Sequence, residues 1–290
     1  MSIQRFRVPA SLLITLVVAL LTGVSSSKPI RLYAQDGSPL TREQTEAREA
    51  LNQGVAAFKN GQYEEAQRLF ERAKQLDPGS LNARLYLGTA YASLYIPGAP
   101  GEENLRNGHL AVEEYKGVLA LDPENLSAID GIGALLFQMA GTPFHPDLFL
   151  ESKSYHQKHV LIRPDDPEPY YWIGVIDWTF SFRGNAELRQ RYNQYVRGRQ
   201  IRDVDPLPDD LRVQYVRDFG PVIDEGIEAL QHAISIRPDY DDAMAYLNLM
   251  YRRKADTVAT KAERAKLTEM ADDLLEKLKE IKQRRAEQRN

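Results

Sequence analysis

Residues 47–80 contain two amphipathic helical patterns, joined by a glycine turn and closed by a proline, and this unit constrains the fold most. Gly61 lies at the turn, and Pro78 ends the second pattern because its ring cannot continue the helical hydrogen-bond ladder. A glycine inside a helix costs about 1 kcal/mol relative to alanine, so Gly54 indicates close packing of two helices. A unit this small cannot bury its apolar faces alone, which predicts stacked neighbouring units.

The closing proline recurs along the chain in similar contexts (QLDP, ALDP, LIRP and SIRP), at Pro78, Pro123, Pro164 and Pro238. The spacing is irregular, so the units differ in length. In contrast, a small or amide residue always follows ten positions after the proline, at Gly88, Gly133, Gly174 and Asn248. The start of each unit is therefore constant, and the extra residues lie between its first and second helices.

The opening unit resembles a tetratricopeptide repeat. It carries the small, alanine, aromatic, alanine and proline residues typical of that family, at Gly54, Ala66, Phe70, Ala73 and Pro78. The resemblance implies an all-α, right-handed superhelical solenoid of about five helix-turn-helix repeats, with insertions between the two helices of a repeat. The repeats are expected within a solenoid at 45–290, at about 47–80, 81–125, 126–166, 167–240 and 241–288.

Three insertions are expected, and the resemblance implies that they share one edge of the solenoid. The first, YIPGAPGEENLRNG, reads as a loop, and the second, AGTPFHPDL, is short. The third, Phe182 to Pro221, is predicted to contain a separate helix at about 186–196, an acidic turn and a helical segment near 211–218. Insertions confined to one face often mark the binding face.

The third insertion is rich in arginine and suggests a patch that binds an anion or an acidic partner, comprising Arg189, Arg191, Arg197 and Arg199. The alternative is that these guanidinium groups pair with nearby carboxylates, at Asp203, Asp205, Asp209 and Asp210. Both interpretations stay open at the level of sequence.

The resemblance also implies that the first helix of each repeat lines an inner groove. The positions carried over predict partner-binding residues that are mainly apolar or aromatic: Phe58, Leu85, Asp130, Phe137, Tyr171, Val175, Trp178 and Arg252. The lysine and asparagine clamp with which some family members hold a peptide carboxylate is not matched. An extended peptide or an apolar helix is the expected occupant.

The densest aromatic segment is PYYWIGVIDWTFSF in the fourth repeat, which runs from Pro169 to Phe182. Aromatic side chains anchor interfaces. On a helix beside a long insertion they also serve to pack that insertion down. The sequence supports the two roles equally.

The formal net charge of −4 disfavours a nucleic-acid partner, and the absence of cysteine excludes thiol chemistry. His156 and His159 have the spacing to share a metal with Glu151 or Asp147, but they fall at positions that the repeat buries. No recognised catalytic motif or phosphate loop is found. We therefore expect no enzyme activity, no cofactor and no metal.

The N-terminal residues have the order of a secretory signal. Arg5 and Arg7 precede an apolar run at Leu12–Val24, which small residues follow. We expect 1–34 to be a signal peptide or N-terminal anchor and 35–44 a linker. Export to the periplasm or cell envelope follows, with membrane anchoring through residues 8–24 as the alternative.

These features predict an exported protein-protein interaction scaffold that binds a peptide or protein in the groove and along the insertion edge. Two alternatives stay open. One is a receptor module for a small ligand or glycan that uses the aromatic pocket of the fourth repeat. The other is a structural assembly subunit of an envelope complex.

Overall fold

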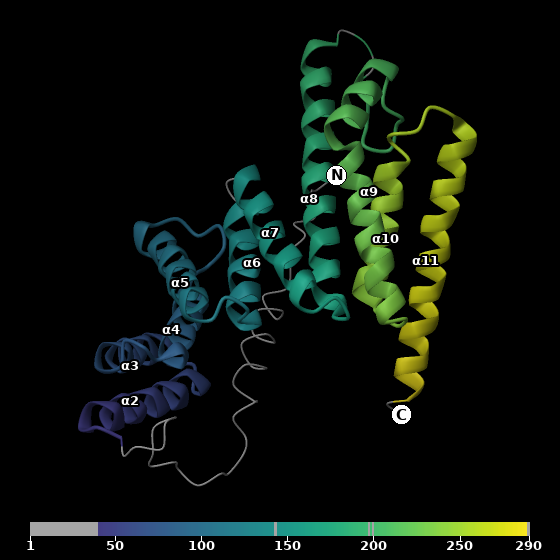
Figure 1. Cartoon of the computed structure of the whole chain (residues 1–290). Coiled ribbons are helices and arrows are strands. Elements are labelled where there is room, and N and C mark those ends of the chain that lie inside the picture. The colour runs from purple at the N-terminus through teal and green to yellow at the C-terminus, as the bar shows by residue number, and fades with distance from the viewer. Residues whose placement is uncertain (1–39, 142–143, 197, 199, 289–290) are drawn as a thin grey trace. The chain divides into compact units, whose positions relative to one another are not determined.

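The computed structural model of the protein describes residues 40–141, 144–196, 198 and 200–288. These residues contain helices and connecting turns but no strand, so the expected all-α helical-repeat fold is confirmed (Figure 1). The helices are α2 (Arg42–Lys59), α3 (Tyr63–Leu76), α4 (Leu81–Leu94), α5 (Glu102–Leu121), α6 (Leu126–Gly141), α7 (Pro146–Ile162), α8 (Pro167–Tyr195), α9 (Asp209–Ile236), α10 (Asp241–Lys254) and α11 (Lys261–Glu287). The expected signal segment, 1–34, lies outside the described residues.

The chain divides into two compact units between Ser152 and Lys153, within α7. In the first unit, α2 packs on α3, α3 on α4, α4 on α5 and α5 on α6. In the second unit, α8 packs on α9 and α10, α9 on α10, and α10 on α11 (Figure 1). Each expected repeat holds one pair of helices, and consecutive helices form most of these contacts.

Small residues set the close approach of the two helices within a repeat. A Cβ added at Gly54 would overlap the ring of Phe70, which is fully buried on the following helix. In the same way, a Cβ at Gly174 of α8 would overlap the side chain of Leu230 on α9. Because protein interiors are close-packed, these glycines fix which second-helix residue lies against each first helix.

Helix α5 takes up half of the first insertion. Only Tyr95–Gly101 of the first insertion lies outside the helices, and α5 takes up the rest. The amide of Asn104 fixes this loop, since its Nδ2 donates to the carbonyl oxygens of Ile96 and Ala99 at 2.9 and 3.0 Å. The prediction of a loop over the whole segment was therefore too broad.

The prediction of a separate helix at 186–196 was wrong. Helix α8 runs without a break for 29 residues, and α9 runs for 28 residues through Pro221, so the third insertion extends both helices of its repeat. Gly184 lets the ring of Phe219 pack directly against α8, and the buried Tyr215 donates a hydrogen bond to the carbonyl of Ser181 at 3.0 Å. The buried contact between the two extensions explains why neither helix ends at the point where the repeat ordinarily turns.

Candidate protein-interaction surface

One face of α8 carries a row of apolar and aromatic side chains that points toward α10. Tyr171, Val175, Trp178 and Phe182 recur at helical spacing, so they share this face. Tyr171 and Val175 are buried, Trp178 is half-buried, and 44% of Phe182 is exposed. The face therefore changes from core to surface along the helix.

Trp178, Phe182 and the half-buried Tyr246 of α10 form the surface part of this face, here called the aromatic stripe. The rings of Trp178 and Phe182 stack, with centroids 5.1 Å apart and planes 19° apart. Tyr246 meets Trp178 edge-on at 5.5 Å, and the guanidinium of Arg253 lies 5.7 Å from the Phe182 centroid. Offset, edge-on and cation–π contacts of this kind hold aromatic rings in place, so the stripe is preorganised.

A polar layer closes the other end of the face. Glu168 accepts hydrogen bonds from the Tyr240 hydroxyl at 2.8 Å and from Arg237 Nη1 at 3.0 Å. Burial raises the pKa of Tyr171, and the nearby Tyr246, Asp242 and Glu168 add to the shift, so its hydroxyl stays protonated. Tyr171 thus packs against Tyr246 of the stripe and is itself almost fully buried.

The remaining aromatic residues of the segment pack away from the stripe. Tyr170 contacts His232 of α9 at 4.3 Å between ring centroids, and Phe180 contacts Phe219 of α9 at 5.5 Å. Trp172 stacks on the buried His156 of α7 at 5.6 Å. The two roles that the sequence left open are therefore divided among different residues, because a helix presents successive side chains to different neighbours.

Residues 47–80 match the sequence profile of the tetratricopeptide repeat. The chain therefore contains a tetratricopeptide repeat. Its fold is similar to solved structures of MamA. One, of residues 41 to the end of MamA from Desulfovibrio magneticus RS-1, has a TM-score of 0.53 and 18% identity, and the match covers 82% of this chain and 96% of that one. A MamA RS-1 double mutant gives a TM-score of 0.54 at 18% identity, covering 83% and 96%. No curated protein sequence gives a significant match.

The predicted groove residues of the first unit lie mainly in its core. Phe58, Leu85 and Phe137 are each 7% exposed, and the Phe137 ring meets Phe149 edge-on at 5.3 Å. Asp130 is half-buried on α6. Their assignment to partner binding stays a prediction, and Asp130 has the greatest surface exposure of the four.

Arg252, the predicted groove residue of α10, is 39% exposed and is held by neighbours. Its Nη2 donates to Asp272 of α11 at 2.7 Å, and its Nε donates to Asn248 at 3.2 Å. A partner that binds Arg252 therefore competes with an ion pair of the repeat itself. Because that pair is exposed, the competition costs at most about 1 kcal/mol.

The proposed anion patch requires a correction at Arg189, which is only 3% exposed. Its Nη2 lies 3.3 Å from an Asp256 carboxylate oxygen, and its Nη1 donates to the carbonyl oxygens of Arg202 and Asp205 at 2.7 and 2.9 Å. Arg189 is thus a buried anchor of the α8–α9 connection. Arg191 is exposed, whereas Arg197 and Arg199 lie outside the described residues.

A buried ion cluster that sequence reasoning missed joins α7, α8 and α9. Lys153 Nζ lies 2.7 Å from Asp177 Oδ1 and 2.7 Å from Glu225 Oε2. Asp177 is 1% exposed, and its Oδ2 has no hydrogen-bond partner among the described residues. Burial raises the pKa of Asp177 to about 7, although the Lys153 ammonium acts in the opposite direction.

The two histidines considered as metal ligands are buried core residues, His156 at 1% and His159 at 3% exposure. Burial lowers the pKa of His156 to about 3, and the nearby His159 adds to this shift, so its ring is neutral at physiological pH. Across the part of the chain that the structure describes, no group of three or more histidine or carboxylate side chains is placed to hold a metal. Within the same residues, no helix is both long and apolar enough to cross a membrane.

Proposed function

We propose that this tetratricopeptide-repeat protein is a protein-interaction scaffold, and that the aromatic stripe of α8 and α10 binds a peptide or protein segment. The observation that carries the proposal is that the exposed Phe182 stacks on the half-buried Trp178, which Tyr246 in turn contacts edge-on. Aromatic side chains dominate binding energy at interfaces because they bury a large area at a small entropic cost. A prebuilt stripe reduces that cost further.

The chemistry of the stripe indicates what the partner presents. Trp178 and Phe182 of α8 present their aromatic rings, while Arg252 and Arg253 lie on α10. Both arginines already pair with carboxylates, Arg253 with Asp256 at 3.2 Å and Arg252 with Asp272. We therefore expect apolar side chains of the partner to supply most of the affinity, as in groove recognition of an extended segment or helix.

A capture experiment with the full chain tests this proposal. Replacing Trp178 and Phe182 together by alanine should abolish partner capture and leave the helical circular dichroism unchanged. Leu161→Ala is the matched control, because Leu161 is 84% exposed on α7, apart from the stripe. Unchanged capture by the double variant would refute the binding site. Saturable quenching of Trp178 by a soluble sugar or small ligand would instead favour a receptor module.

We also propose that the protein is exported to the periplasm or cell envelope. The support is the order of basic, apolar and small residues within 1–34. N-terminal sequencing of the protein from fractionated cells tests this, with a start after the apolar run expected. An envelope-bound protein that retains residues 8–24 would indicate an anchor, whereas full-length protein in the cytosol would contradict export.

A further inference from the structure

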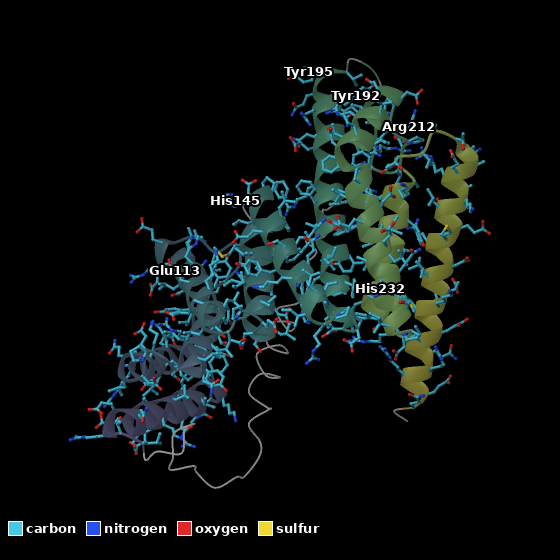
Figure 2. The ribbon with its side chains drawn as sticks, in the orientation of Figure 1. Glu113, His145, Tyr192, Tyr195, Arg212 and His232 are labelled. Atoms are coloured by element: carbon cyan, nitrogen blue, oxygen red, sulfur yellow. The ribbon has the colours of Figure 1, made fainter. Side chains whose placement is uncertain are left out.

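The outer end of the α8–α9 extension contains an open groove of about 370 Å³ that is distinct from the aromatic stripe. The labels in Figure 2 place Tyr192 and Tyr195 at this end of α8. The groove is lined by Leu188, Arg191, Tyr192, Tyr195, Val196, Leu211 and Gln214. Its volume lies within the range of ligand sites and suits a few side chains of a partner.

Side chains hold residues 201–205 of the connection between the two helices, so the groove lies beside an anchored segment. The amide of Asn193 binds Ile201 twice, accepting from its N–H and donating to its carbonyl, both at 2.9 Å. Buried Arg189 binds two further carbonyls of the connection, and Arg202 pairs with Asp205 at 2.9 Å. A site held this way loses little entropy on binding.

Large apolar side chains stay exposed at this end of the extension. Tyr195 is 84% exposed, and Val213 on the facing helix is 60% exposed. Leu188 at the floor of the groove is 3% exposed, so the apolar surface continues from core to solvent. Single exposed apolar residues are ordinary, but Tyr195 lines the same groove as the buried Leu188, and exposed apolar surface beside a cavity is typical of an interaction site.

Among the described residues that line the groove, Arg191 alone carries a charge, and that charge is positive. The Arg191 side chain is 56% exposed, and its Nε lies 3.9 Å from Glu187, whose side chain is 64% exposed. An exposed pair at this distance is weak, so the guanidinium remains able to bind another carboxylate. A complementary partner therefore combines an apolar side chain with an adjacent acidic one.

We propose that this groove binds a peptide segment of a protein partner in which a large apolar side chain neighbours an aspartate or glutamate. The apolar side chain enters between Tyr195 and Leu211, and the carboxylate pairs with Arg191. The described lining sets one cation beside apolar side chains, which is complementary to a peptide segment of this composition. The site shares no residue with the aromatic stripe, so the two proposals stand or fall separately.

The test uses the full chain and two pools of short fluorescein-labelled peptides, followed by fluorescence anisotropy. In one pool leucine, isoleucine, phenylalanine or tryptophan neighbours aspartate or glutamate, and in the other the acidic residue is replaced by lysine. Binding is expected from the acidic pool alone. Arg191→Glu and Tyr195→Ser should each weaken it by about fivefold or more, since a lost contact of about 1 kcal/mol has this effect. Leu161→Ser is the exposed control and should bind as the parent does.

Four outcomes would overturn the proposal. They are failure of every acidic peptide to bind, equal binding of the lysine pool, no effect of either groove variant, and Tyr195-dependent binding to phosphatidylglycerol vesicles without peptide binding. The double variant at Trp178 and Phe182 separates this site from the stripe. If that variant abolishes peptide binding, the peptides occupy the stripe and the groove proposal is wrong, whereas the proposed function is supported.

Discussion

Tyr246 of α10 meets Trp178 of α8 edge-on, with 5.5 Å between ring centroids and planes 78° apart. The same tyrosine lies 5.7 Å from Tyr171, so one side chain supports both the buried and the exposed parts of the face. The conformation of the aromatic stripe is therefore set by packing between successive first helices. This relationship makes Tyr246 the residue on which the stripe depends most.

Tyr246→Ala should loosen Trp178 and expose it to water. Measured in a Trp172→Phe background, where Trp178 is the one remaining tryptophan, the fluorescence emission should move to longer wavelength. Partner capture should weaken as well, because loss of the edge-on contact removes about 0.5–1.5 kcal/mol of ring support. Tyr195→Ala, at the far end of α8, should leave the emission unchanged. An unshifted spectrum in the Tyr246 variant would contradict the role given to this contact.

Gly174→Ala should destabilise the second unit by about 1–3 kcal/mol, since the new methyl group would overlap the buried Leu230. Gly220→Ala in α9 is the matched control, because a Cβ there meets only Val216 at 3.7 Å and alanine favours a helix. Thermal and urea denaturation of both variants provide the comparison. Equal stability of the two would mean that the helices are less closely packed than the structure shows.

Lys153→Met should destabilise the protein by about 1–3 kcal/mol, because it leaves the buried Asp177 without its hydrogen-bond partner. The variant Lys116→Met is the control, since Lys116 makes an exposed pair with Glu151 and should change stability by less than about 1 kcal/mol. Urea denaturation at neutral pH measures both. A loss of similar size in the two variants would contradict a special role for the buried cluster.

The stability of the native protein should depend on pH through Asp177. Burial raises its pKa from the ordinary 3.8 to about 7, so the folded chain holds a proton that the unfolded chain has lost. The contribution of this proton is fully present below about pH 4 and is lost as the pH rises through about 7. In Asp177→Asn this decline should disappear from the stability profile between these pH values. An identical profile for parent and variant would contradict the assignment.

Arg189→Met should release the α8–α9 connection, since it removes hydrogen bonds to two carbonyl oxygens of the connection. It also removes one of the cations that pair with the Asp256 carboxylate. Hydrogen exchange of the backbone amides between 200 and 208 should become faster, while exchange in α11 stays unchanged. Arg191→Met is the control and should leave exchange in the connection as it was. Unaltered protection in the Arg189 variant would mean that other contacts hold the connection.

The repeat pattern was predictable because it rests on local signals. Prolines that end helices and small residues where two helices cross can be recognised from the sequence. Gly54 and Gly174 lie at such crossings in the structure. The extension of α8 was not predictable in this way. Its continuity depends on Phe219 and Tyr215 of α9, which are more than thirty residues away and compete with the local turn signals.

The candidate surface was predictable only in part. The positions carried over from the repeat include Tyr171, Val175 and Trp178, which share one face of α8, but Tyr246 was missed because its contact with Trp178 joins residues far apart in the chain. Arg189 looked like surface charge since its partner Asp256 is far along the chain. Pairings of this kind depend on tertiary packing, which sequence spacing does not encode.

Photo-crosslinking from position 182 in intact cells tests the central claim most directly. A photoreactive amino acid replaces Phe182, and mass spectrometry identifies the trapped molecules, with position 161 as the exposed control. The proposed function predicts a defined protein adduct from position 182 that is absent from position 161 and is lost when Trp178 is also replaced by alanine. The absence of any protein adduct specific to position 182 would contradict it.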